Sequence, residues 1–255
     1  MKAVILAAGR GSRLGPHCAD IPKCLVELAG KPLLLWQLEA LAKAGINDVI
    51  VVAGYKSEKI HDFLSASSVK FNVVENDRWF ETNMLSSLLC ASKLASEDDA
   101  IVSYSDIVYP SRHIEKLMKN RHSIAITYDV DWYKLWSLRN NQNPLADAET
   151  FRQKDGELLE IGGKPENLDQ AQGQYMGLIK LTVSGWRTWL TGCADLGERV
   201  DKTDMTSFIS RLLKENHSVG ATSVEGAWCE VDTDKDLELY EKALLDGRFS
   251  HDWRE

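Results

Sequence analysis

Along the first hundred residues, short apolar runs alternate with segments in which apolar residues recur at helical spacing. A continuous apolar run is typical of a strand buried on both faces of a parallel sheet, and the helical spacing predicts an amphipathic helix. In chain order the pattern predicts strand 3–8, helix 32–44, strand 48–53, helix 57–64, strand 71–75, helix 83–94 and strand 100–104. This alternation predicts an α/β fold with a Rossmann-like, doubly wound, mostly parallel sheet.

Residues 129–173 break the alternation, because aromatic, Asn, Pro and charged residues dominate there and only 157–161 has a strand pattern. We interpret this stretch as an inserted lobe that faces the substrate. The pattern then resumes with strand 175–182, helix 205–214, a strand end at 229–232 and helix 234–245. Since α/β chains of 255 residues often form one unit, we predict a single domain, 1–255, with the lobe at about 129–173.

Charge and composition exclude several classes of protein. The net charge of −8 and the pI near 5.4 argue against a nucleic-acid-binding face, which needs clustered Lys and Arg. The apolar run at 3–8 is too short for a signal sequence, and no run approaches the roughly 20 residues of a membrane span. We therefore predict a cytoplasmic protein without membrane insertion. Its five scattered cysteines predict free thiols.

A glycine-rich loop follows the first predicted strand, where segment 6–14 reads Leu-Ala-Ala-Gly-Arg-Gly-Ser-Arg-Leu. Without a Cβ at Gly9 and Gly11, backbone N–H groups can approach a phosphate, and Arg13 and Lys23 add positive charge. The bare pattern is equally consistent with a plain structural turn. Dinucleotide binding is disfavoured because Leu14 replaces the third glycine of that motif, and a Walker A pattern is absent.

Two aspartates are candidate metal ligands. Asp106 follows the strand 100–104, so its carboxylate would lie at the carboxyl end of the sheet, where ligands bind. Asp232 is the last residue of the strand end at 229–232, just before the last helix. Carboxylate oxygens suit Mg²⁺. The residues alone leave open an Asx turn or cap at Asp106, and a helix N-cap at Asp232 or Asp234.

The loop 6–14, followed by Ile-Pro-Lys-Cys-Leu at 21–25, resembles the signature of nucleotidyltransferases of the nucleotide-sugar pyrophosphorylase superfamily. These enzymes make nucleotide sugars and related CDP compounds, and the resemblance extends in order over most of the chain. It implies a GT-A-like nucleotidyltransferase fold, Lys23, Arg13 and Asp106 in catalysis, and Asp106 and Asp232 on one Mg²⁺. The nucleotide-binding residues that it implies are Leu6, Ala8, Gly9, Gly11, Ser12, Arg13, Lys23, Asn83 and Ser105.

Segment 75–84, which contains Thr82 and Asn83, resembles the cytidylyltransferase branch, which includes the phosphocholine and 2-aminoethylphosphonate enzymes. The resemblance implies CTP as the nucleotide. An acceptor phosphate or phosphonate would attack its α-phosphorus and release pyrophosphate. From the residues alone, Thr82 and Asn83 serve equally well as caps of the next helix.

Segments 131–149 and 173–178 resemble the same branch and contain the acceptor-binding candidates. These candidates are Trp132, Trp136, Arg139, Asp147, Glu149, Gln174 and Tyr175. The two tryptophans lie four residues apart, a spacing that would place them on one face if the segment were helical, and they suit either a cage for a quaternary ammonium group or an aromatic core. The charged candidates suit an acceptor site or surface ion pairs. Phosphocholine, 2-aminoethylphosphonate and a phosphorylated amide or amino alcohol that decorates a surface polysaccharide all stay open as acceptors.

The expected partners are CTP, Mg²⁺ and the phosphorylated acceptor, and the resemblance adds a homodimer because members of this family often form dimers. The alternative enzyme is a sugar-1-phosphate thymidylyl- or uridylyltransferase. A catalytically silent regulatory protein of the same fold is the alternative from another class, and a dinucleotide-dependent oxidoreductase is a more distant one.

Overall fold

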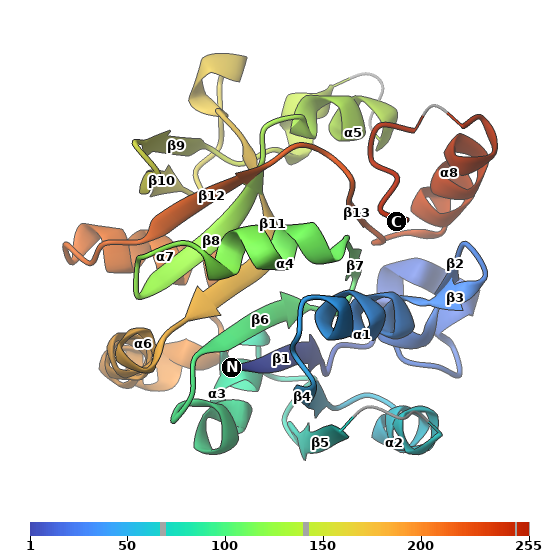
Figure 1. The fold of residues 1–255 in the computed structure, drawn as a ribbon, viewed down its shortest axis with the longest axis horizontal. Helices are drawn as coiled ribbons and strands as arrows, with labels where there is room; N and C mark the ends of the chain where they lie inside the picture. Colours follow the sequence, from blue (N-terminus) through green and yellow to red (C-terminus); the bar gives the residue numbers. More distant parts are fainter. Residues whose placement is uncertain (67–69, 140–142, 248, 255) are drawn as a thin grey trace.

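The computed structural model describes residues 1–66, 70–139, 143–247 and 249–254 (Figure 1). Within these residues a nine-stranded sheet has the order β5-β4-β1-β6-β11-β8-β12-β10-β9. Its strands are β1 Lys2–Ala7, β4 Asp48–Ala53, β5 Lys70–Glu75, β6 Ala100–Tyr104, β8 Ile124–Asp129, β9 Phe151–Lys154, β10 Glu157–Ile161, β11 Gln174–Leu181 and β12 Gly220–Val224. Only β11 and β10 run against the other seven strands, so the sheet is mixed but mostly of one direction.

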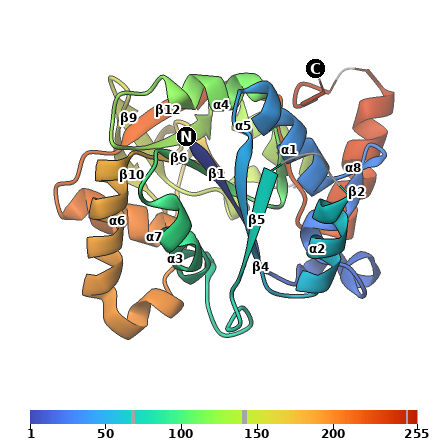
Figure 2. The same cartoon turned by 60° about the horizontal axis from the view of Figure 1, so that its bottom comes forward.

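Helices cover both faces of this sheet, which Figure 2 shows nearly edge-on. One core contains apolar side chains of α1 Leu33–Lys43, α2 Ser57–Ser65, α4 Ser111–Met118, α5 Trp132–Arg139 and α8 Asp234–Leu245. The other core contains those of α3 Met84–Ala95, α6 Val183–Leu196 and α7 Met205–Lys214. Strand β1 alternates between the cores, with Ile5 in the first and Val4 and Leu6 in the second. The predicted α/β class with a doubly wound sheet is confirmed.

Most predicted elements occur within a few residues of their expected bounds, but several others were missed. The pattern did not predict α4, α5, α6, β8, β9 or β12. Helix α5 has only eight residues, too few for a clear apolar period, and lies in the stretch that we expected to be irregular. The short strands β9 and β12 show as little periodicity.

The expected lobe contributes strands to the main sheet. Strands β9 and β10 form a hairpin at the sheet edge, and β10 also pairs with β12. The connection contains Asp155 and Gly156, both with positive φ, as an Asp-Gly hairpin turn requires. That dipeptide was a signal for the hairpin that we did not use. The division into one domain with a lobe at about 129–173 stays a prediction.

Smaller elements complete the chain. Two short antiparallel pairs form, β2 Glu27–Leu28 with β3 Lys31–Pro32, and β7 Ile107–Val108 with β13 Cys229–Glu230. The 3-10 helices are η1 Ser12–Cys18, η2 Lys23–Leu25, η3 Pro144–Asp147, η4 Leu168–Gln170 and η5 Gly197–Asp201.

The lengths of the helices and the state of the cysteines can be read from the structure. In the described part of the chain, every helix is too short or too polar to cross a membrane. All five cysteines are free thiols, as predicted.

Candidate active site

A two-stranded sheet brings the two candidate metal ligands together. Strand β7 follows Asp106 directly, and it pairs with β13, which precedes Asp232. The N–H of Val231 also donates to the carbonyl of Asp106 at 2.9 Å. One carboxylate oxygen each from Asp106, Glu230 and Asp232 lies within 4.8 Å of the others. Segments far apart in the chain therefore form one acidic cluster, which we define by these three residues.

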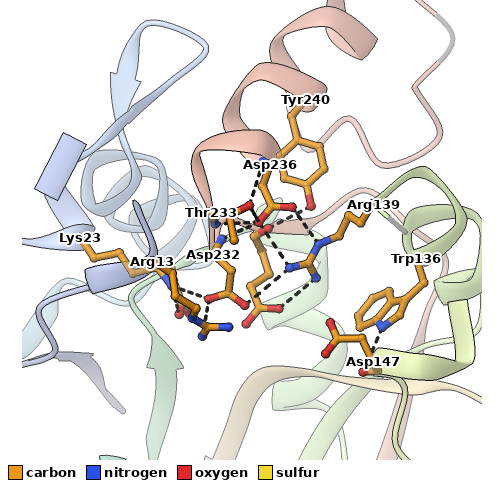
Figure 3. Close-up of polar contacts among 11 residues, drawn as sticks. Arg13, Lys23, Trp136, Arg139, Asp147, Asp232, Thr233, Asp236 and Tyr240 are labelled. Atoms are coloured by element: carbon orange, nitrogen blue, oxygen red, sulfur yellow. Dashed lines mark hydrogen bonds and ion pairs between the residues drawn. The ribbon is translucent and has the colours of Figure 1, made fainter. Parts of the chain in front are cut away.

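Lys23 and Arg13 lie on this acidic cluster (Figure 3). The Lys23 ammonium donates to Asp106 Oδ2 at 2.8 Å and to Asp232 Oδ1 at 2.7 Å. Arg13 Nη2 donates to the same Asp232 Oδ1 at 3.1 Å. Burial opposes the charge of Lys23, but Asp106 and Asp232 outweigh it and raise the pKa of the ammonium. The predicted catalytic residues Lys23, Arg13 and Asp106 and the predicted ligand Asp232 thus meet at one place.

The glycine loop makes room for the Lys23 side chain. Gly11 has φ +69°, and a Cβ there would lie 2.8 Å from Lys23 Cβ and 3.0 Å from its Cγ. A larger residue at position 11 would displace the lysine. In contrast, a Cβ at Gly9 would meet nothing within 4 Å, so the loop is open at that residue. Gly11 therefore acts through Lys23, whereas Gly9 leaves space for a ligand.

The buried side-chain amide of Gln37 holds the turn that carries Asp106. Gln37 of α1 is fully buried, and its Nε2 donates to the carbonyls of Tyr104 at 2.9 Å and Ile107 at 2.6 Å. These carbonyls flank Asp106 on both sides. The side chain of Gln37 thereby keeps the turn between β6 and β7 in place.

The start of α8 orients Asp232. Thr233 is the N-cap and forms a capping box with Asp236, so Asp232 and Asp234 do not have the cap role left open above. Asp236 Oδ2 accepts from the N–H of Asp232 at 3.0 Å and of Thr233 at 2.8 Å. The carboxylate of Asp236 therefore holds the backbone that carries Asp232.

Glu230 is a site residue that the sequence interpretation missed. Burial, Asp232 and Asp106 raise its pKa to about 7, although Arg139 and Lys23 oppose the shift. The pKa of Asp232 is shifted in the opposite direction. Burial raises it, but Lys23, Arg13 and Arg139 outweigh burial and lower the pKa. Glu230 stands two residues before Asp232, and this alternation along an extended chain was the available signal.

The donor set of the acidic cluster fits a divalent cation. It offers three carboxylates, which are hard oxygen ligands of the kind that Mg²⁺ and Ca²⁺ take. Among the described residues, Asp106 Oδ1 is buried without a hydrogen-bond partner. A cation would give this oxygen the partner that a buried polar atom requires.

The other nucleotide-binding candidates surround the loop or have structural contacts. Leu6 and Ala8 are buried at the end of β1 and beyond it, and the Ala8 carbonyl accepts from the N–H of Tyr55. Ser12 is exposed and Ser105 is buried beside Asp106. Asn83 is the N-cap of α3, which is the capping role left open above. The nucleotide contacts of these residues stay predictions.

The two predicted acceptor tryptophans lie in the core. Trp132 is 4% exposed and Trp136 is 6% exposed. Their rings pack edge to face at 6.0 Å, and Trp136 also contacts Trp228 and the Arg139 guanidinium. The Trp132 indole donates to Ala171 and the Trp136 indole donates to the carbonyl of Asp147. This is the aromatic-core alternative, and it leaves little ring surface for an acceptor.

The remaining acceptor candidates form separate contacts. Gln174 holds the backbone of Glu149, since its Nε2 donates to the Glu149 carbonyl and its Oε1 accepts from the Glu149 N–H. Burial raises the pKa of the Glu149 carboxyl, which accepts from Thr206 Oγ1 at 3.1 Å. Tyr175 packs edge to face on Tyr104. The acceptor contacts of these residues and of exposed Asp147 stay predictions.

The chain is similar to a known family over most of its length. Residues 3–153 match the MobA-like NTP transferase domain. The chain is 35% identical to CTP:phosphoglutamine cytidylyltransferase of Campylobacter jejuni, over 94% of this chain and 98% of that protein. This similarity confirms the resemblance stated above and excludes the oxidoreductase alternative.

Solved structures show the same fold. The inositol-1-phosphate CTP transferase from T. maritima matches with a TM-score of 0.73 and 18% identity, covering 94% of this chain and 95% of that chain. The CTP:phosphocholine cytidylyltransferase from Streptococcus pneumoniae matches with a TM-score of 0.68 and 24% identity, covering 95% and 98%. With Lys23, Arg13 and the acidic cluster in one site, the chain belongs to the MobA-like NTP transferase family and is a nucleotidyltransferase.

Proposed function

We propose that this protein couples CTP to a small phosphorylated acceptor and releases pyrophosphate. The observation that carries the proposal is the similarity, over nearly the full length of both chains, to an enzyme named for CTP and phosphoglutamine. The meeting of Lys23, Arg13 and the acidic cluster supports it, because nucleotidyl transfer needs cationic groups beside carboxylates.

The proposed reaction needs no nucleophile from the protein. An oxygen of the acceptor phosphate forms a bond to the α-phosphorus of CTP, the bond from that phosphorus to the β-phosphate oxygen breaks, and pyrophosphate leaves with the electron pair. The acceptor phosphate is already ionised at neutral pH. Positioning and charge stabilisation therefore supply the catalysis, with Lys23 and Arg13 neutralising the charge on the phosphate oxygens.

We propose Mg²⁺ as the cation of the acidic cluster, held by Asp106, Glu230 and Asp232. When bound, it would neutralise phosphate charge and polarise the phosphorus-oxygen bonds. Lys23 contacts two of the same carboxylates, so its ammonium balances their charge and keeps them together. The flexible stem of lysine allows this ammonium to turn to a phosphate oxygen instead.

Among the acceptors, we propose the phosphorylated amide or amino alcohol type over phosphocholine. An enzyme named for phosphoglutamine is similar over 94% of this chain and 98% of its own length. The burial of Trp132 and Trp136 supports the same choice, because a quaternary ammonium group needs exposed aromatic faces. Use of the product in surface polysaccharide decoration, a cytoplasmic location and a homodimer belong to the same proposal.

A pyrophosphate-release assay tests this function. The purified protein would be offered CTP, UTP, dTTP and GTP in turn with Mg²⁺ and phosphoglutamine, phosphocholine, 2-aminoethylphosphonate or glucose 1-phosphate. We expect release only with CTP, most rapidly with phosphoglutamine, and a product of the CDP-linked mass. Lys23→Ala and Asp106→Ala should lower the rate at least about 100-fold with the fold intact.

Three results would contradict the proposal. Turnover of UTP or dTTP with glucose 1-phosphate would assign the protein to the sugar branch instead. Wild-type rates in Lys23→Ala or Asp106→Ala would remove the proposed site, and no turnover with any pair would favour a silent regulatory protein.

A further inference from the structure

Arg139, the last residue of α5, is surrounded by carboxylates. Its Nε lies 3.1 Å from Asp236 Oδ1, its Nη1 lies 3.2 Å from Glu230 Oε2 and its Nη2 lies 3.5 Å from Asp232 Oδ2. The guanidinium carbon also lies 5.5 Å from the centre of the Trp136 ring. The side chain is only 9% exposed. Each of its three nitrogens thus has a carboxylate partner within the protein.

The two carboxylate oxygens of Asp232 contact different cations. Oδ1 accepts from Lys23 and Arg13, whereas Oδ2 faces Arg139 (Figure 3). Lys23 is also bonded to Asp106, whereas Arg139 is bonded to Asp236 at the start of α8. Arg139 therefore contacts the cluster through a different set of oxygens from the one that Lys23 occupies.

The charges around Arg139 explain why its guanidinium is needed beside the carboxylates. Asp106, Glu230, Asp232 and Asp236 carry four potential negative charges, against three positive charges on Lys23, Arg13 and Arg139. Without Arg139, the half-buried Glu230 and the buried Asp236 would lose their cationic partner. Unpaired buried carboxylates repel one another and turn away from each other.

We propose that Arg139 is a positioning residue for the divalent-cation site and not an acceptor ligand. Its planar guanidinium orients Glu230 and Asp232 together, and it links the segment that carries them to α5 and α8. The inference rests on the proposed function only for the identity of the cation that the cluster holds. It corrects our expectation for Arg139, because a phosphate clamp needs guanidinium nitrogens that are not already bound to carboxylates.

Direct cation binding tests the proposal without turnover. Mn²⁺ binding would be measured by electron paramagnetic resonance on the full chain, without nucleotide, for the wild type, Arg139→Met and Arg139→Lys. We expect Arg139→Met to weaken Mn²⁺ binding at least about 10-fold, since residues that orient metal ligands have effects of this size. Arg139→Lys keeps the positive charge but loses the planar guanidinium. Its Mn²⁺ affinity should fall between those of the wild type and Arg139→Met.

Arg211→Met is the matched control, because Arg211 of α7 pairs with Glu215, which follows that helix, and should be dispensable for Mn²⁺ binding. Circular dichroism would confirm that each variant folds. Mn²⁺ binding by both Arg139 variants as tight as in the wild type, or tighter, would overturn the proposal. So would a wild type that binds no Mn²⁺. If only Arg139→Met fails to fold, the result with Arg139→Lys decides.

Steady-state kinetics distinguish positioning from acceptor binding. If Arg139 positions the carboxylates, Arg139→Lys should lower kcat and raise the Mg²⁺ concentration required, with an unchanged KM for the acceptor. A raised acceptor KM with normal Mn²⁺ binding would instead make Arg139 an acceptor ligand. If wild-type CTP turnover fails but the Mn²⁺ effect remains, the proposed function is wrong and the positioning role stands.

Discussion

Gly11 shows how one residue without a side chain can control another residue in the site. Its positive φ and its 2.8 Å approach to Lys23 Cβ mean that an added methyl group meets both backbone strain and the lysine stem. The phosphate-binding role of a glycine loop is usually assigned to its N–H groups. Here the loop also sets the direction of the ammonium that contacts Asp106 and Asp232.

We therefore predict that Gly11→Ala lowers kcat/KM for CTP at least about 10-fold, because a 1 Å displacement of a catalytic group has effects of up to about 100-fold. Gly30→Ala is the matched control: Gly30 has φ +75°, but a Cβ there meets nothing within 4 Å. Both variants should lose similar stability from backbone strain. Equal activities in the two variants would show that Gly11 does not act through Lys23.

At the scale of elements, the start of α8 combines a stability role with a site role. Thr233 caps the helix, and its neighbour Asp232 contacts Lys23. Loss of the cap should therefore affect both the helix and the acidic cluster. A cap elsewhere should affect only its own helix.

We predict that Thr233→Ala lowers the free energy of unfolding by about 1 kcal/mol and also weakens Mn²⁺ binding. Thr182→Ala is the control, since Thr182 caps α6 by accepting from the N–H of Gly185 at 3.1 Å. Urea unfolding should show a similar loss of stability in both variants. If the Mn²⁺ affinity falls equally in both variants, or in neither, the capping box has no specific role in the acidic cluster.

At the scale of the whole molecule, Asp129 joins three distant segments. This fully buried residue ends β8 and accepts from the N–H of Gly226 and the indole of Trp228, both at 2.9 Å. His251 Nε2, from the C-terminal segment, lies 2.8 Å from Asp129 Oδ2. Burial opposes ionisation, but His251 and the N–H donors outweigh it and lower the pKa of Asp129.

A group whose pKa is lower in the folded state stabilises the fold above its unfolded pKa, and this contribution disappears as pH falls through the folded value. We predict that Asp129→Asn lowers the free energy of unfolding by about 2–3 kcal/mol at neutral pH. The difference from the wild type should shrink below about pH 4. Urea unfolding from pH 7 to pH 3 measures it, with Asp252→Asn at a more exposed ion pair as control. A difference that does not change with pH would contradict the assigned cause.

Local patterns predicted a large part of this fold because residues close together in the sequence decide which strands and helices form. The buried run of β1 is apolar on both faces since both faces are covered by helices, and that need is visible in the residues themselves. The loop with Gly9 and Gly11 and the positive charges of Arg13 and Lys23 are likewise visible in a short stretch of sequence. The eight-residue α5 and the short edge strand β9 were missed because their formation depends on tertiary packing.

The sequence by itself thus determined the fold class and the glycine loop with Lys23 beyond it, because each lies in a local pattern with a physical reason, whereas Asp106 and Asp232 became metal-ligand candidates through the family resemblance. Only the tertiary structure decided which of them meet. Pairing of β7 with β13 brings Glu230 beside Asp106, and the position of α5 directs Arg139 to carboxylates. Such contacts join residues far apart in the chain, and their geometry follows from packing of the whole molecule, which no local pattern contains.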